Sequence, residues 1–150
     1  MTSTHQHDST VSEATARELM DTAIAAYANA YAPYSQFRVG AALLTAETET
    51  QEAVVFQGCN VENAAYSLAI CAERVAITQA VAKGYRQFRA IAVVAEQTQP
   101  CFPCGSCRQF LSELAPTLEV IILEADGSLS RHGIAELLPY AFNAEALPPR

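Results

Sequence analysis

The sequence predicts an α/β fold in which helices are layered on a mixed β-sheet. Helical and strand-like segments follow one another in the order helix, two strands, helix, strand, helix, strand. Two consecutive strands suit an antiparallel hairpin, whereas a strand, a helix and a further strand suit a parallel crossover. The chain has 150 residues, 51% of them hydrophobic, and can bury one sizeable core. We expect a single domain over residues 13–150 and a disordered tail over residues 1–12.

The first half of the chain predicts one helix and a hairpin. Thr15 and Glu18 have the spacing of a capping box, and the apolar residues that follow share one helical face. The apolar residues 37–44 predict a strand, and residues 53–59 predict a second strand after a polar turn. The polar, turn-rich residues 60–67 then predict a loop.

The second half predicts the rest of the sheet and the helices that connect its strands. Helical periodicity over residues 72–83 ends at Gly84, a residue typical of helix C-terminal caps. Asp126-Gly127 predicts a tight turn. The other expected elements are strands at residues 88–95, 118–123 and 128–132 and helices at residues 104–114 and 134–138.

The net charge of the chain indicates which kinds of molecule it can bind. The net charge of -7 and a pI near 4.8 argue against nucleic acid and anionic membranes, which attract basic surfaces. We therefore expect a small-molecule substrate, no nucleic acid and no membrane. The polar start resembles no secretory signal, and five cysteines, three of them between Cys101 and Cys107, suit metal ligation in a reducing compartment. The expected location is the cytoplasm.

Three cysteines predict a metal centre. Cys71, Cys104 and Cys107 all fall at the beginnings of predicted helices, where free N–H groups and the helix dipole stabilise thiolates. Zinc binds thiolates well, and a catalytic zinc takes three protein ligands and leaves its fourth position to water. Cys104 and Cys107 can reach one ion from a single helical turn, and Cys71 supplies the third ligand. We expect one Zn²⁺ ion per chain.

Charged residues beside the cysteines have expected roles in this centre. Three thiolates on one divalent ion leave a net charge of about -1. Arg74 and Arg108 are expected to offset this charge by donating hydrogen bonds to the sulfurs. Glu73 is too close in sequence to Cys71 to bind the same ion easily, and we expect it to transfer protons between water and substrate.

Two other kinds of metal site are compatible with the cysteine spacing. The run Cys101-x-x-Cys104-x-x-Cys107 resembles an iron–sulfur ligand set, with Cys59 or Cys71 as a fourth ligand. A structural zinc site would use Cys71 or Cys101 as the fourth ligand and so close the open position. The iron–sulfur alternative leaves the neighbouring glutamate and arginine without a role.

The motif around the cysteines is that of zinc deaminases. These enzymes combine a His or Cys, a glutamate two residues later and a Pro-Cys-x-x-Cys run, which here read Cys71-Ala72-Glu73 and Pro103-Cys104-Gly105-Ser106-Cys107. Over most of its length the chain resembles the small, homotetrameric cytidine deaminases. The segments that carry the resemblance are residues 32–35, 37, 39–43, 58–67, 71–74, 103–105, 107–109, 136–139 and 142.

This resemblance implies a fold, an activity and a set of substrate contacts. The fold is a three-layer α-β-α arrangement with a central mixed sheet of about five strands. The activity is hydrolytic deamination of cytidine and 2′-deoxycytidine in pyrimidine salvage, with attack at C4 and Glu73 moving the protons. Asn60 and Glu62 would bind the ribose, Phe37 would line the pyrimidine pocket, and the Ala72 backbone amide would bind the pyrimidine carbonyl.

The resemblance also implies a homotetramer with shared active sites. Phe142, Ala64 and Tyr66 would reach into the site of a neighbouring subunit. There Phe142 would stack on the base, and the other two residues would lie near the 5′ end of the ribose.

Two residues depart from the family pattern, and one rival substrate exists. Phe102 stands where the family commonly has a small residue, and Cys101 at the position whose backbone carbonyl faces the substrate amino group. We expect the chemistry to survive these changes, whereas pocket shape and substrate range can differ. Deaminases of the antibiotic blasticidin S share the Pro-Cys-Gly-x-Cys-Arg-Gln and Glu-Leu-Leu-Pro segments, but residues 60–66 match the ribose-binding segment and favour cytidine.

Overall fold

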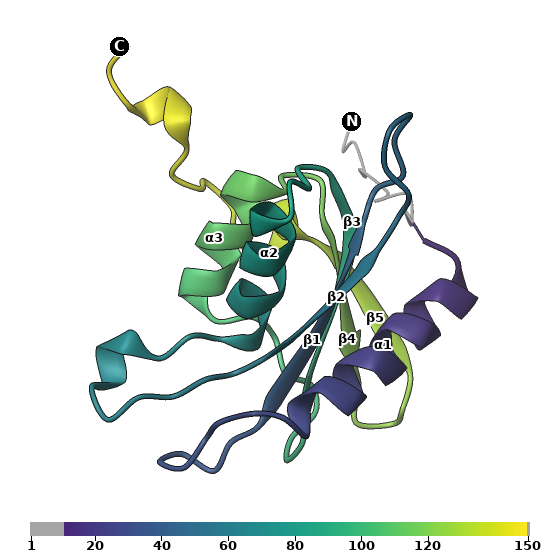
Figure 1. The fold of residues 1–150 in the computed structure, drawn as a ribbon, viewed down its shortest axis with the longest axis vertical. Coiled ribbons are helices and arrows are strands. Elements are labelled where there is room, and N and C mark those ends of the chain that lie inside the picture. The colour runs from purple at the N-terminus through teal and green to yellow at the C-terminus, as the bar shows by residue number, and fades with distance from the viewer. Residues whose placement is uncertain (1–10, 150) are drawn as a thin grey trace, which may run out of the picture.

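A five-stranded sheet with the strand order β2-β1-β3-β4-β5 forms the centre of the molecule. The structure is a computed structural model and describes residues 11–149. Helix α1 covers one face of the sheet, and α2 and α3 lie side by side on the other (Figure 1). The predicted three-layer α/β fold with a mixed sheet is thus confirmed.

Every expected helix and strand is present, with small shifts at the ends. Two single turns of 3₁₀ helix, η1 and η2, were not expected. The strands are β1 Val39–Thr45, β2 Val55–Cys59, β3 Phe88–Ala95, β4 Glu119–Leu123 and β5 Leu129–Gly133. The helices are α1 Glu13–Tyr27, α2 Ala72–Ala82, α3 Gly105–Leu114 and α4 Ile134–Leu137, with η1 at Tyr66–Leu68 and η2 at Ala144–Ala146.

The first helix begins earlier than expected. Helix α1 is capped by Ser12, whose Oγ accepts a hydrogen bond from the Thr15 backbone N–H at 3.1 Å. The capping box predicted at Thr15 is therefore wrong, because that residue already lies in the first helical turn. Val11 is buried in the core beneath α1. The remainder of the predicted tail, residues 1–10, lies outside the described residues.

The sheet combines two hairpins, β1–β2 and β4–β5, with two crossovers. Strand β1 pairs antiparallel with both β2 and β3, β3 pairs parallel with β4, and β4 pairs antiparallel with β5. Because β1 lies between β2 and β3, the connection through α2 joins two strands that run in the same direction without being neighbours. Only the crossover through α3 joins adjacent parallel strands, β3 and β4.

Burial on both faces of the sheet explains its apolar strands. Ala41 and Leu43 of β1 belong to the core beneath α2 and α3, whereas Ala42 and Leu44 belong to the core beneath α1. Successive side chains of a strand point to opposite faces, so a strand covered on both sides is apolar at nearly every position. None of the helices within residues 11–149 combines the length and apolar character that a membrane span requires.

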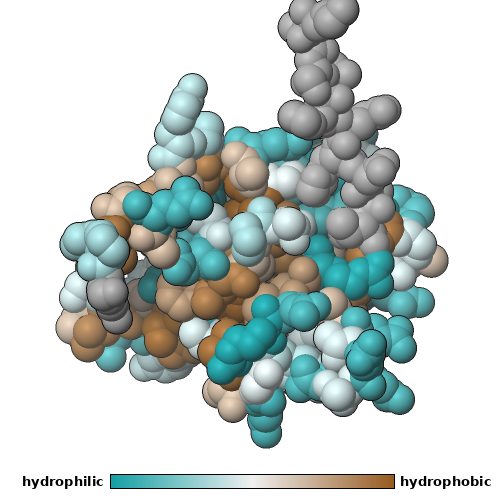
Figure 2. All heavy atoms as spheres, turned by 90° about the horizontal axis from the view of Figure 1, so that it is seen from above, coloured by the Kyte–Doolittle hydropathy of each residue, from teal (hydrophilic) through white to brown (hydrophobic). Residues whose placement is uncertain are grey.

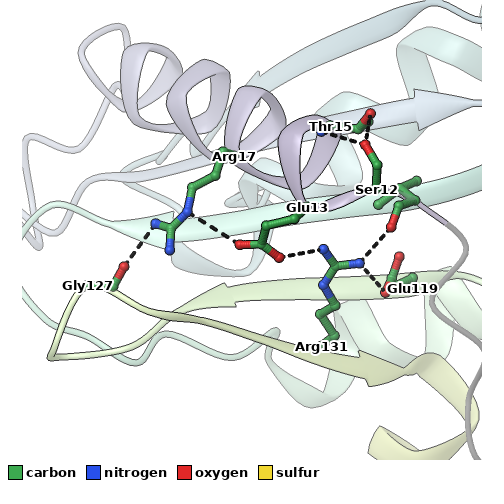
Figure 3. A network of polar contacts seen from close by, with 8 residues as sticks. Ser12, Glu13, Thr15, Arg17, Glu119, Gly127 and Arg131 are labelled. Carbon is green, nitrogen blue, oxygen red and sulfur yellow. Dashed lines mark hydrogen bonds and ion pairs between the residues drawn. The ribbon is translucent and has the colours of Figure 1, made fainter.

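A polar network fastens the start of α1 to strands β4 and β5 (Figure 3). Arg131 of β5 donates to the Val11 carbonyl at 2.8 Å and contacts the carboxylates of Glu13 and Glu119 at 2.9 and 3.3 Å. The Glu119 side chain is fully buried. A buried carboxylate needs such a partner, since its charge has lost its hydration.

We expect Arg131→Leu to destabilise the fold, because Glu119 would lose a positive charge that compensates its own. The free energy of unfolding, measured by urea denaturation, should fall by about 3 kcal/mol. Arg38→Leu is the matched control, since Arg38 pairs with Glu96 at 3.8 Å and both side chains are about half exposed. That change should cost less than about 1 kcal/mol, and equal losses in the two variants would contradict the role assigned to Arg131.

Candidate active site

The sulfurs of three cysteines meet where helices α2 and α3 begin. Cys71 is the N-cap residue of α2, Cys104 is the N-cap residue of α3, and Cys107 lies in the first turn of α3. The Sγ atoms of Cys71 and Cys104 are 3.8 Å apart, and all three Sγ atoms lie within 4.8 Å of one another. Neither N-cap sulfur caps its own helix. The structure thus brings together the three predicted metal ligands.

A direct backbone contact sets the position of the α2 N-terminus. A Cβ atom added to Gly58 of β2 would lie 2.1 Å from the Ala72 carbonyl oxygen and 2.8 Å from the Ala76 nitrogen. Only a residue without a side chain allows the first turn of the helix to approach the strand so closely. Gly58 therefore determines where Cys71 stands relative to the sheet.

The protonation of the cysteines suits a metal site. A hydrogen bond from Cys107, followed by hydrogen bonds from Arg74 and Cys104, lowers the pKa of Cys71 to about 5 against the opposing effect of burial. The same hydrogen bond, together with burial, raises the pKa of Cys107, so the sulfurs share their protons. Burial raises the pKa of Cys101 to about 11. The Cys101 thiol is therefore protonated at neutral pH.

The two arginines beside the cysteines have different partners. Arg74 donates from Nη2 to the Cys71 sulfur at 3.7 Å and to the Ala69 carbonyl at 3.3 Å. Arg108 donates to the carbonyls of Pro103 at 2.8 Å and Leu137 at 3.0 Å, and its expected hydrogen bond to the sulfurs stays a prediction. Arg108 thus holds the segment before Cys104 against the end of α4.

Glu73 is a carboxyl buried beside this cluster. Its residue is 4% exposed, and burial, with the nearby charge of Cys71, raises the pKa of the Glu73 carboxyl to about 7. A carboxyl with a pKa near neutrality can both accept and donate a proton at physiological pH. Perturbed acids of this kind are typical of catalytic sites.

A cavity of about 470 Å³ is lined by Glu73 and by Cys71 and Cys104 of the cluster. Of the residues predicted to contact substrate within the subunit, all four line it: Phe37, Asn60, Glu62 and Ala72. Sequence reasoning gave no role to Ser35, Val39, Val61, Ala69 or Ile70, which also line the cavity. The strand and loop patterns around these residues predict their conformation but not the side on which the cavity opens.

Asn60 and Glu62 are held firmly by the backbone around the cavity. The Asn60 side-chain amide donates to the Phe37 carbonyl and accepts from the Val39 N–H, both at 2.8 Å. Glu62 accepts from the backbone N–H of Tyr34 at 3.0 Å and of Ser35 at 3.1 Å, and from the Ser35 hydroxyl. The bonds from Ser35 are the main reason that the pKa of Glu62 is lowered. Glu62 is thus a carboxylate of fixed orientation at neutral pH.

Three predicted substrate residues lie away from this cavity. Ala64 and Tyr66 are exposed on the loop that follows β2, which extends far from the body of the subunit (Figure 1). Tyr66 is 75% exposed, and Phe142, near the C-terminus, is 62% exposed. Within one subunit they do not line the cavity that holds Glu73, so their predicted role across a subunit interface stays a prediction.

The residues at the cysteine cluster fit a zinc ion. Three thiols at two helix N-termini form a donor set of the kind zinc prefers, and two of them, Cys71 and Cys104, also line the cavity. The Nε atom of Arg74 is buried without a hydrogen-bond partner in the described structure, as expected for a cation placed to offset the charge of bound thiolates. Among residues 11–149, Cys59 and Cys101 do not belong to the cluster, so no fourth cysteine closes it.

Comparison with known proteins identifies the group to which the chain is similar. The family model described as the cytidine and deoxycytidylate deaminase zinc-binding region matches residues 13–124. A cytidine deaminase of Sporosarcina psychrophila is 44% identical over 119 residues, covering 79% of this chain and 84% of the relative. A cytidine deaminase of Halalkalibacterium halodurans is 45% identical over 128 residues, which cover 85% of this chain and 93% of the relative. The zinc-binding family argues against the iron–sulfur alternative.

Solved structures agree with the sequence relatives. The crystal structure of cytidine deaminase from Burkholderia pseudomallei has 50% sequence identity and a TM-score of 0.76, covering 84% of this chain and 98% of that one. The crystal structure of cytidine deaminase from Mycobacterium tuberculosis has 35% sequence identity and a TM-score of 0.72, and the match covers 84% of this chain and 95% of that one. Likeness in sequence and in structure therefore points to one family.

We expect Gly58→Ala to weaken both the fold and the metal centre, because the added methyl group would push the α2 N-terminus and Cys71 away from β2. The free energy of unfolding of the metal-free protein should fall by about 2 kcal/mol. Its affinity for Zn²⁺, measured by competition with a coloured chelator, should fall as well. Gly105→Ala is the control, since nothing lies within 4 Å of the added atom. Unchanged zinc affinity in Gly58→Ala would contradict the positioning role.

Proposed function

The chain belongs to the cytidine and deoxycytidylate deaminase family, and from this premise we propose that it hydrolyses cytidine and 2′-deoxycytidine to the corresponding uridines and ammonia. The observation that carries the proposal is a buried carboxyl, Glu73, beside three clustered cysteines at the inner end of a cavity. A cavity of about 470 Å³ has the size of a small-molecule site.

Cys71, Cys104 and Cys107 would hold one zinc ion per chain. Bound there, zinc would supply an acidified water molecule as the nucleophile. Arg74 contacts the Cys71 sulfur and would offset part of the negative charge of the three thiolates, which otherwise makes such a water less acidic.

Glu73 would move the protons that the reaction requires. Its carboxylate would take a proton from the attacking water and deliver it to N3 of the pyrimidine, and it would then help protonate the departing amino group. One water molecule is consumed, the bond from C4 to nitrogen breaks, and ammonia leaves. Ala72 is the first residue of α2, so its N–H has no acceptor within the helix and can bind the pyrimidine carbonyl.

Residues on the loops at the mouth of the cavity would bind the nucleoside. Phe37 would contact the pyrimidine, and Asn60 and Glu62 would bind the ribose hydroxyls. The Asn60 amide retains one further N–H, and the Glu62 carboxylate retains free lone pairs beyond the bonds described above. Both can therefore engage a sugar without giving up the contacts that orient them.

The charge and the cysteines of the chain favour a particular kind of substrate and a particular compartment. A nucleic acid strand binds to a cationic path, which a net charge of -7 argues against, so free nucleosides are the proposed substrates. Returning them as uridines is a step of pyrimidine salvage, for which we propose a cytoplasmic location in keeping with reduced cysteine ligands.

We propose further that the protein is a homotetramer with shared active sites. Several large apolar side chains are exposed on the subunit, including Tyr66, Leu68, Tyr140 and Phe142. Figure 2 shows hydrophobic residues gathered on the surface between hydrophilic ones, here at the end of the subunit seen from above. Exposed apolar patches typically mark interfaces between proteins. Ala64, Tyr66 and Phe142 would then complete a neighbour's cavity.

The decisive assay follows the loss of cytosine absorbance when zinc-loaded protein is mixed with cytidine. We expect turnover by the wild type and a loss of at least about a hundredfold in kcat for Glu73→Gln, because glutamine fills the same space but cannot transfer a proton. Zinc content should be unchanged. Glu113→Gln, on the exposed side of α3, is the control. An inactive wild type would refute the proposed activity, and an active Glu73→Gln would refute the role of the carboxyl.

Subunit mixing tests whether active sites are shared. Phe142→Ala and Glu73→Gln should each be nearly inactive alone, one lacking the contributed ring and the other the proton carrier. If the sites are shared, exchanging subunits between the two variants should restore activity, since some sites then combine an intact Glu73 with an intact Phe142 from a neighbour. Mixed tetramers, verified by native mass spectrometry, that remain inactive would contradict shared sites.

A further inference from the structure

Phe102 forms part of the wall at the reactive end of the cavity. It lines the cavity together with Glu73, Cys101 and Cys104, and its other side packs against the core beneath α2 and α3. Any ring whose reacting carbon reaches Glu73 and the cysteines therefore brings its neighbouring atoms close to Phe102. In cytosine the atoms bonded to C4 are N3, to which Glu73 would deliver a proton, C5 and the exocyclic nitrogen, and the last two can carry a methyl group while N3 stays free for that proton.

His132 supports Phe102 from behind. The two rings meet edge to face, with centroids 5.0 Å apart and planes inclined at 65°, an arrangement favoured by the quadrupoles of aromatic rings. His132 lies on strand β5 opposite Val120 of β4, whose side chain belongs to the core beneath α2 and α3. The imidazole thus projects from the edge strand towards the layer that contains the cavity.

A chain of hydrogen bonds fixes the orientation of the imidazole. The Ser130 hydroxyl donates to the Glu124 carboxylate, and the His132 Nε2 atom lies 2.9 Å from the same hydroxyl oxygen. A hydroxyl has one proton to donate, and Ser130 gives it to Glu124. Ser130 must therefore accept from His132, which places a proton on Nε2. His132 thus donates a hydrogen bond to Ser130, and Ser130 donates one to Glu124.

We propose that Phe102 determines which groups beside the reacting carbon the cavity accepts, and that His132 is a positioning residue that holds the Phe102 ring in place. This inference rests on the proposed deaminase function and deepens it. The aromatic wall excludes substituents at C5 or on the exocyclic nitrogen, while unsubstituted cytidine passes. His132 acts only through Phe102 and touches no reacting atom.

The test compares kcat/KM for cytidine, 5-methylcytidine and N4-methylcytidine in zinc-loaded protein. For Phe102→Ala we expect the preference for cytidine over at least one methylated substrate to fall by about tenfold, the discrimination that one methyl group commonly allows. His132→Ala should lower the same preference by a smaller factor, about threefold, since a loosened ring still fills part of the space. The double variant should match Phe102→Ala, because His132 has no other route to the substrate.

A second aromatic pair provides the control. Phe56 and Tyr85 also meet edge to face, at 5.4 Å and 67°, and pack on the same core without lining the cavity, so Tyr85→Ala should leave the preference unchanged. If Phe102→Ala does not fold, Phe102→Leu replaces it. Unchanged preference in the Phe102 variant, or an added effect of His132→Ala in the double variant, overturns the inference. An inactive wild type instead overturns the proposed function.

Discussion

The close approach of two helix N-termini is the constraint on which the candidate site depends. Helices α2 and α3 lie on the same face of the sheet and begin at the same place, so that Cys71 and Cys104 can stand 3.8 Å apart. This arrangement requires α2 to touch β2 through backbone atoms at Gly58. The dipoles of both helices and the Arg74 guanidinium then favour negative sulfurs at one point. The packing of α2 against β2 thus determines how much positive potential the sulfurs experience.

Burial raises the pKa of three neighbouring groups of the site, but at one of them hydrogen bonds outweigh it. It holds the Glu73 carboxyl near neutrality and keeps the Cys101 thiol protonated, while hydrogen bonds overcome it at Cys71. A proton carrier and a thiolate can therefore coexist within one small volume, because hydrogen-bond donors surround the sulfur whereas desolvation dominates at the carboxyl. Acid–base chemistry requires neighbouring groups whose pKa values differ in this way.

Much of the fold and of the metal centre could be predicted from local patterns. Strand and helix periodicity predicted every main element, and the spacing of Cys71, Cys104 and Cys107 identified the cluster. Two expectations differ from the contacts observed, for different reasons. The helix cap was expected at Thr15 and lies at Ser12, since both residue types are good N-caps and the local pattern does not choose between them. Arg108 was expected at the sulfurs because it adjoins Cys107, yet its guanidinium points to the carbonyls of other segments. Sequence adjacency does not determine the direction of a long side chain, and only tertiary structure does.

The three donors that hold Glu62 have a consequence for the entropy of binding. A free glutamate side chain samples many rotamers and loses that freedom when it orders against a ligand. Here hydrogen bonds from the loop at Tyr34 and Ser35 order the carboxylate as part of the fold. For the proposed contact with a ribose hydroxyl, this side-chain entropy is lost when the chain folds and not when the ligand binds, so ordering Glu62 subtracts little from the affinity.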